Sequence, residues 1–272
     1  MMRLIRADFY RMLRGKGVYI NFALMLLVIA LMIFVFRAAV NTGVTISEEM
    51  ETIESGPISA IIPAPEEIMN GAVAVQIALD SMDGLGYYFI LPLIIMVAMA
   101  AFSSGAIKND LAVGINRTKL YLSKLILSSA LSFVFMFLYV ALAVIFAIMI
   151  DGIGYWGGFS EKLLSFGMQL FIMLAVNSVG IFFCFATRRT AAAIGAFLAF
   201  AFIPIMIAAL LSVAFPRALD FFYYDLMYQL VIFSQTAGLT CTDFIRGIVI
   251  GLVYLVVPTI GGILLFRKVE IK

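Results

Sequence analysis

SSGAIKNDLAVGINRTKLYLSK, residues 103–124, is a polar break between two long apolar runs, Tyr87–Phe102 and Leu125–Ile150. The break combines a turn signal and a short amphipathic segment with a basic cluster of Lys108, Arg117, Lys119 and Lys124. If the flanking runs cross a bilayer, this basic excess places the break in the cytoplasm. Asn109 or Asp110 can cap a short helix there, and Gly114 can end one. Such a helix offers a surface that a soluble partner could bind and displace.

The composition of the chain decides its broad class. Of its 272 residues, 64% are hydrophobic and 12% are charged, and the mean hydropathy is +1.13. A soluble domain is roughly half apolar and a quarter charged. A soluble fold of this length could not bury so much apolar surface, so we expect an integral membrane protein. The chain has no His, which argues against a transition-metal site and against His-based catalysis.

The apolar runs predict an all-α membrane protein with six transmembrane helices. Each run is close to the roughly 20 residues that a helix needs to cross the hydrocarbon layer. The predicted spans are Val18–Phe36, Tyr87–Phe102, Leu122–Ile150, Leu163–Thr187, Thr190–Phe215 and Phe244–Phe266. The second is the shortest, and it could run on to Ile107.

The charges predict that both termini lie in the cytoplasm. With this orientation, 14 of the 18 basic residues lie inside and 13 of the 16 acidic residues lie outside. A split of this kind is a strong topology signal. The segments between the spans are then an interfacial helix over 1–17, an outer loop over 38–86, a cytoplasmic loop over 103–121 and an outer region over 216–243.

The N-terminal segment has the pattern of a basic amphipathic helix. Apolar residues fall on one helical face, namely Ile5, Phe9, Met12 and Leu13. Basic residues fall on the other, namely Arg3, Arg6, Arg11 and Arg14. A helix of this kind lies in the membrane interface. It could serve only as a topological anchor, or it could be an elbow helix that also touches a partner.

Several residues within the predicted spans indicate helix packing. The fourth span carries three polar side chains in an apolar context, Gln169, Asn177 and Ser178. We expect hydrogen bonds between helices from them, with a transport path as the alternative. Small residues four apart let helices approach closely, and such pairs are Ala192 with Ala196 and Gly247 with Gly251. These faces could pack within the chain or between two subunits.

The outer region 216–243 contains a short apolar segment, Leu226–Ser234, which is too short to cross a bilayer. We expect an interfacial or re-entrant helix there. Cys184 lies near the inner end of the fourth span and Cys241 lies outside. The bilayer would separate the two thiols, so we expect no intramolecular disulfide.

The sequence lacks the common signatures of chemistry and of self-powered transport. It contains no GxxxxGK[ST] phosphate loop, no HExxH, no GxSxG and no Cys/His metal spacing. It also lacks two matching halves with interrupted helices, which are usual in carriers. We therefore expect no cofactor, no metal and no nucleic-acid partner. What remains is a membrane protein whose energy is supplied by another protein that contacts its cytoplasmic surface.

Four segments in order carry a family resemblance: RLIRADFYRMLRGKGVYI, GAIKNDLAVGINRTKLYLSK, ATRRTAAAIG and the closing RKVEIK. With the long outer loop and the re-entrant segment, the chain resembles a permease subunit of the type-2 ATP-binding-cassette exporters. The resemblance implies that residues 1–272 form one transmembrane permease domain. It implies a bacterial plasma membrane, because the size is similar to small bacterial members that pair with a separate ATPase. Several of these members export antimicrobial peptides or confer resistance to them.

The resemblance also implies how such a protein works. In that family the loop after the second span forms a coupling helix that sits in a groove of the ATPase. The matching residues here are Asn109, Asp110, Leu111, Gly114, Ile115, Asn116 and Arg117. A second permease copy or a paralogue would complete the transporter. It would move an amphipathic or hydrophobic substrate outward, either a peptide or a lipid-like molecule. The alternative is that this loop is an ordinary basic loop that only fixes topology.

Two other classes of function stay open at this point. One is a membrane-embedded enzyme of lipid or prenyl chemistry. Such an enzyme normally gathers charged residues at one membrane face to hold metal and phosphate, whereas the inner acids Asp8, Asp110 and Glu270 are widely scattered. The other is a sensor or structural subunit without transport.

Overall fold

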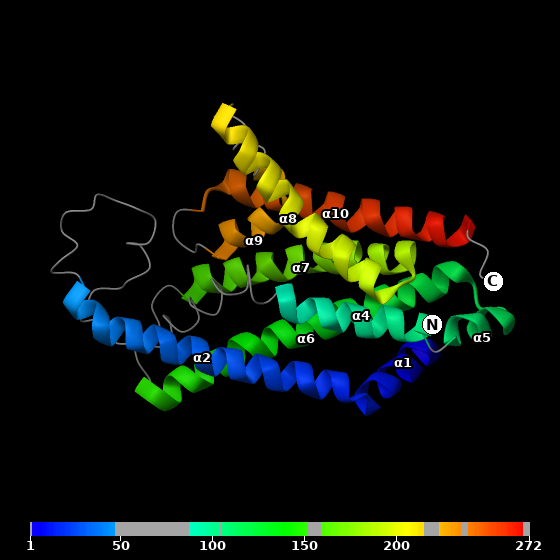
Figure 1. Ribbon diagram of the computed structural model, residues 1–272, viewed down its shortest axis with the longest axis horizontal. Helices are drawn as coiled ribbons and strands as arrows, with labels where there is room; N and C mark the ends of the chain where they lie inside the picture. The colour runs from blue at the N-terminus through cyan, green and yellow to red at the C-terminus, as the bar shows by residue number, and fades with distance from the viewer. Residues whose placement is uncertain are drawn as a thin grey trace.

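The protein is a bundle of helices, as the computed structural model shows (Figure 1). The structure describes residues 2–46, 87–103, 105–151, 159–214, 223–234 and 239–268. Within these residues the chain contains helices and no strand, which confirms the all-α prediction. The helices are α1 (Met2–Arg14), α2 (Lys16–Ile46), α4 (Tyr87–Ser103), α5 (Ala106–Ala112), α6 (Arg117–Asp151), α7 (Phe159–Thr187), α8 (Thr190–Ala214), α9 (Leu226–Ser234) and α10 (Cys241–Lys268).

Four helices contain stretches long and apolar enough to cross a membrane: Lys16–Val35, Arg117–Phe146, Lys162–Thr187 and Cys241–Lys268. Two shorter apolar helical stretches accompany them, Phe89–Phe102 and Thr190–Pro204. The chain is thus an integral membrane protein, and the crossing of the two shorter stretches stays a prediction. Several helices are longer than expected. Among them, α2 continues past Phe36 to Ile46, into the expected outer loop, and α6 begins at Arg117 instead of Leu122. The rest of that loop, 47–86, lies outside the described residues.

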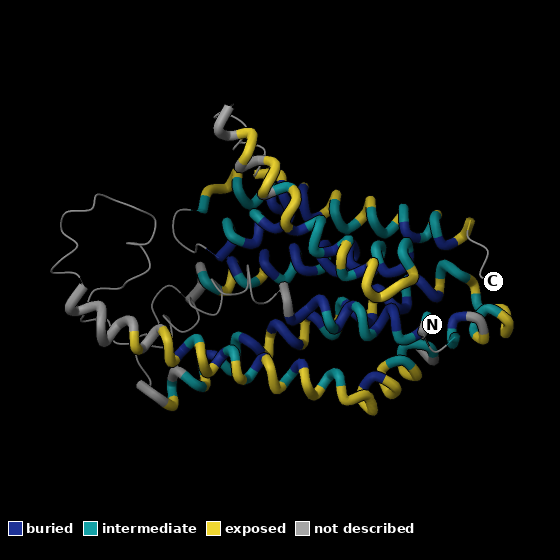
Figure 2. The backbone as a smooth tube through the Cα atoms, viewed as in Figure 1, coloured by how far each residue is buried: buried dark blue, intermediate teal, exposed yellow. Residues whose placement is uncertain are grey.

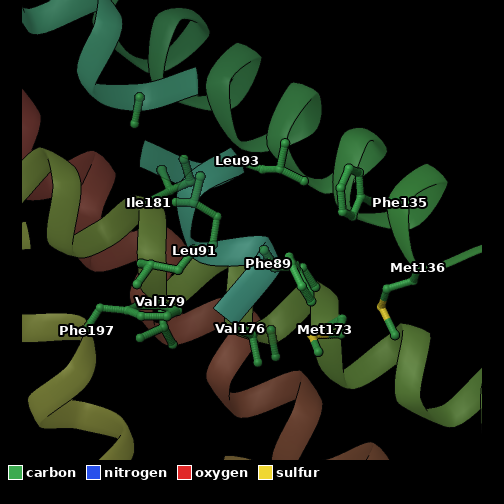
Figure 3. Packing of buried hydrophobic residues seen from close by; sticks show 14 of the residues in the cluster. Phe89, Leu91, Leu93, Phe135, Met136, Met173, Val176, Val179, Ile181 and Phe197 are labelled. Carbon is green, nitrogen blue, oxygen red and sulfur yellow. The ribbon is translucent and has the colours of Figure 1, made fainter. Parts of the chain in front are cut away.

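The centre of the bundle is α7, which packs against α4, α6, α8, α9 and α10. Figure 2 shows buried residues along α4 and α7, whereas α2 is exposed along much of its length. In Figure 3, Leu93 of α4, Met136 of α6 and Phe197 of α8 are part of the same core as Val176 and Ile181 of α7. The outward faces of α2, α8 and α10 are also apolar, with exposed residues such as Phe34, Met206 and Val257. Helices that are apolar on both faces suit a bundle surrounded by lipid.

Polar side chains on α7 bind neighbouring helices, as the sequence predicted. Asn177 Oδ1 accepts hydrogen bonds from Ser128 at 3.2 Å and from Ser132 at 3.0 Å, both on α6. The next residue, Ser178, faces α10, where its hydroxyl lies 2.8 Å from Oγ1 of Thr259 and 2.9 Å from the carbonyl oxygen of Leu255. Gln169 is fully buried as well. Two successive residues of α7 therefore bind two different helices, α6 and α10.

The small residues fall into two groups. At Gly247 a Cβ atom would overlap the ring of Phe233 in α9, and at Gly251 it would overlap the ring of Phe171 in α7. This GxxxG face thus packs within the chain. On α8, Ala192 is exposed and Ala196 is half-buried, and a Cβ atom at Gly195 would meet open space. The buried residues at that end of α8 are Ala193 and Phe197 instead.

The short helix α9 covers the same residues that the sequence predicted, Leu226–Ser234. It is buried against α7 and also contacts α10, and its Leu226, Leu230 and Phe233 are fully covered. Its depth in the bilayer stays a prediction. The two thiols are free: Cys184 is buried near the end of α7 and Cys241 is exposed at the start of α10.

Candidate functional site

The short helix α5 is held against the bundle by one face. Ile107 is buried and Leu111, one turn later, packs against the same core. The helix begins after Gly105, whose backbone is left-handed with φ of 68°. Asn109 and Asp110 lie inside the helix, so neither caps it, contrary to the prediction. The reason is that burial of Ile107 and Leu111 requires the helix to begin earlier than the polar residues suggested.

The end of α5 is a Schellman motif, which confirms that Gly114 ends the helix. Gly114 has φ of 86°, a left-handed conformation that glycine adopts without strain. The Gly114 amide donates to the carbonyl of Leu111 at 3.0 Å, and the Ile115 amide donates to that of Asp110 at 3.1 Å. These two bonds satisfy carbonyls that the last turn leaves open. The turn therefore has a fixed shape.

Asn116 starts the next helix. Its side-chain Oδ1 accepts the Thr118 amide at 3.0 Å, and its carbonyl accepts the Leu120 amide at 3.1 Å. This is the geometry of an N-cap. Gly114 and Asn116 thus build the turn between α5 and α6, which we name the coupling turn (residues 113–116).

The coupling turn and the last turns of α5 include several exposed residues. Asn109, Ala112, Gly114 and Asn116 are exposed. Val113 is 83% exposed, the highest value among the exposed large hydrophobic side chains of the described residues. The sequence prediction passed over Val113, although a single apolar residue beside Gly114 in a polar break was the available signal. An apolar side chain at the tip of a rigid turn releases water when a partner covers it.

Arg117 turns back toward the bundle. Its Nη1 donates to the main-chain carbonyls of Phe266 and Arg267, both at 3.1 Å. Its guanidinium also lies 6.0 Å from the centre of the Phe266 ring. Among the seven residues matched to the coupling helix, Arg117 therefore contacts α10, and Leu111 contacts the core.

The N-terminal helix α1 is attached to the bundle beside this site. Met12 is buried against Val97 and Leu127. The Lys124 side chain is 1% exposed, and its Nζ atom lies 2.5 Å from Oδ2 of Asp8. The other carboxylate oxygen of Asp8 accepts from Arg11 at 2.8 Å. The predicted elbow residues are exposed, namely Arg6, Phe9, Arg11 and Arg14. The sequence prediction did not pair Asp8 with Lys124.

These elements gather at one end of the bundle. Figure 1 places α1, α5 and the C-terminal end of α10 on the same side. The exposed cations of this end include Lys119, Arg267 and Lys268. Among the described residues, no three His, Cys, Asp or Glu side chains gather in a way that could hold a metal ion. The arrangement is thus a rigid, exposed turn with basic residues around it.

A second polar group lies at the N-terminus of α9. Oδ2 of the buried Asp225 accepts the amides of Met227 and Tyr228, both at 3.1 Å. Nε2 of Gln229 donates to the carbonyl of Tyr223 at 2.5 Å, while its Oε1 has no hydrogen-bond partner. Burial raises the pKa of the Asp225 carboxyl, and the backbone hydrogen bonds oppose that shift.

Comparison with known protein families identifies the family of this chain. A family model described as "ABC-2 family transporter protein" matches residues 4–204, which run from α1 through the coupling turn into α8. A comparison with curated proteins finds no match. The matched region is well over half of the chain and includes the exposed turn at the end of α5. The chain therefore belongs to the ABC-2 family of transporter proteins and is a transmembrane subunit of an ATP-binding-cassette transporter.

Proposed function

We propose that this chain is the permease of an exporter that a separate cytoplasmic ATPase drives through the coupling turn. The observation that supports the proposal is that α5 has one buried face and is followed by an exposed apolar side chain in the coupling turn. Ile107 and Leu111 fix α5 to the bundle, and Val113 projects beyond it. A partner that covers Val113 can thus displace the whole inner end of the bundle. ATP biases the permease only if the ATPase contacts its two states differently.

The translocation route in this proposal runs between two copies of the permease or a copy and a paralogue. Asn177 and Ser178 are consumed in hydrogen bonds between helices, so they are not available to line a path through α7. The open face of α8 around Ala192 and Gly195 supports close approach of a second subunit. A cavity between lipid-facing helices suits an amphipathic or hydrophobic substrate, either a peptide or a lipid-like molecule. Antimicrobial peptides are the first class to assay.

The proposed orientation puts both termini in the cytoplasm of a bacterial cell. Basic residues at the inner end support it under the positive-inside rule. In that orientation α1 lies in the membrane interface as the elbow helix. Arg6, Arg11 and Arg14 then face the headgroups, and the exposed Phe9 faces the acyl chains.

A reconstituted assay tests the proposal. The tagged permease is purified from its native membranes with the captured ATPase and placed in proteoliposomes, and ATP hydrolysis and substrate uptake are measured. We expect Val113→Asp to lose the ATPase and uptake, because the charge replaces the apolar contact. Lys119→Gln is the matched control, since Lys119 is exposed beside the turn but outside α5. Full ATPase capture and uptake in Val113→Asp would refute the proposal.

A further inference from the structure

The inner end of α10 is bound to the first turn of α6 by reciprocal hydrogen bonds. Arg117 donates to the carbonyls of Phe266 and Arg267, and Nε of Arg267 donates to Oγ1 of Thr118 at 3.1 Å. Both carbonyls belong to the last turn of α10, where no later amide of the helix reaches them. The guanidinium also brings positive charge to the negative end of that helix. We name this set of contacts the α6–α10 clamp.

Packing continues the clamp along both helices. Tyr121 is fully buried, and its hydroxyl donates to the carbonyl of Pro258 at 3.4 Å. The backbone of Gly262 lies directly against the Tyr121 ring, because a Cβ atom there would overlap it. The Phe266 ring packs edge-on to Phe185 of α7 at 4.9 Å. The start of α6 and the inner half of α10 therefore form one packed unit.

The other end of α10 contacts α9, which packs mainly against α7. Gly247 gives room to the Phe233 ring, and Phe244 packs against the same ring with centroids 5.5 Å apart. A displacement of α10 thus reaches α9 directly. Helix α10 thus accepts hydrogen bonds from the residues next to the coupling turn at its inner end and contacts α9 near its other end.

We infer that Arg117 is a positioning residue that carries movement of the coupling turn into α10 and so to α9 at the outer end of the bundle. This inference rests on the proposed function. It differs from a role in binding the ATPase, because the Arg117 guanidinium is committed to carbonyls of α10. Loss of the clamp should leave the ATPase bound but stop the outer end of the bundle from responding to nucleotide.

The chain contains a native reporter for this response. Cys241 is exposed at the first residue of α10, whereas Cys184 is buried. The experiment uses the permease–ATPase complex in proteoliposomes and measures the labelling rate of Cys241 by a membrane-impermeant maleimide. The rate is measured with and without a non-hydrolysable ATP analogue. The variants are Arg117→Gln and Arg117→Lys, with Lys119→Gln as the control of equal charge change.

In the wild type, the nucleotide analogue should change the labelling rate of Cys241 by about fivefold or more. Fivefold is the low end of the range for coupling between two sites in proteins. Arg117→Gln should abolish this change while ATPase capture is retained, and Arg117→Lys should restore part of it. Lys119→Gln should behave as the wild type. If Arg117→Gln fails to fold, Thr118→Val removes the other half of the clamp and should reduce the same change.

Three outcomes overturn the inference. One is an unchanged nucleotide response in Arg117→Gln or Thr118→Val. The second is an equal loss in Lys119→Gln, which would show a general effect of charge. The third is a wild-type complex that hydrolyses ATP but shows no response at Cys241. Failure of the proposed function looks different, because the wild-type permease would then capture no ATPase at all.

Discussion

The ion pair between Asp8 and Lys124 gives a perturbation whose size follows from the structure. The Lys124 side chain is 1% exposed, and its charge is compensated by the carboxylate of Asp8, which is 12% exposed. Asp8→Ala removes that carboxylate and leaves an ammonium group buried without a partner. A loss of this kind costs about 3–5 kcal/mol of unfolding free energy. Lys124→Met should cost about 1 kcal/mol or less, because Asp8 keeps Arg11 at 2.8 Å.

The assay is thermal unfolding of the purified chain in detergent at neutral pH. Each kcal/mol lowers the Tm of a chain of this size by about 2–4 °C, so Asp8→Ala should lower it by about 6–20 °C. The double variant, with both substitutions, should lie close to Lys124→Met, because no uncompensated buried charge remains. The two single changes should therefore be strongly non-additive.

Arg11→Gln is the control, since Arg11 is an exposed partner of the same carboxylate and should shift the stability by about 1 kcal/mol at most. The reasoning is refuted if Asp8→Ala and Arg11→Gln lower the Tm equally. It is also refuted if the double variant is less stable than Asp8→Ala.

Four further predictions follow from single sites. Gly247→Ala should destabilise the chain by about 1–3 kcal/mol because the new methyl group meets the Phe233 ring. Gly195→Ala meets open space within one chain, so in the chain purified without a second copy it should be neutral or up to about 1 kcal/mol more stable, and equal Tm losses in the two variants would contradict the packing. Asn177→Leu should cost about 1 kcal/mol by removing the acceptor shared by two serines of α6, and an unchanged Tm would show that these bonds contribute nothing. Asp225 has a pKa above its ordinary 3.8 in the folded chain, so the folded state binds the proton more tightly, and this residue's contribution to stability falls as the pH rises from 3.8 through the raised pKa. Asp225→Asn keeps a capping oxygen but does not titrate, so its Tm relative to that of the wild type should rise as the pH rises over that range. A difference in Tm between the two that is constant with pH would exclude the effect.

The sequence predicted the helices well because a membrane imposes strong constraints on them. Backbone groups in lipid must be satisfied within the helix, so long apolar runs become helices. The end of α5 was also predictable, since Gly114 is a local signal that needs no tertiary contact. The same holds for α9, where the apolar run ends at Ser234 on one side and begins after Asp225 on the other.

What the sequence could not show depends on how helices meet. The partner of Lys124 is Asp8, more than a hundred residues away, and the pair exists only because α1 packs beside α6. Arg117 was expected to face an ATPase, and its turn toward α10 is likewise tertiary. The start of α5 was misplaced because capping preferences favour Asn and Asp, whereas burial of Ile107 decided the actual boundary.

The central claim is that a cytoplasmic ATPase binds the coupling turn. Site-specific photo-crosslinking in cells tests this claim most directly. A photoreactive amino acid replaces Val113, and in a separate strain it replaces Ile245, which is 59% exposed near the first residues of α10. The account predicts an adduct at position 113 with a protein that carries a phosphate-loop sequence, and no such adduct at position 245. An ATPase adduct at position 245 with none at position 113 would contradict it.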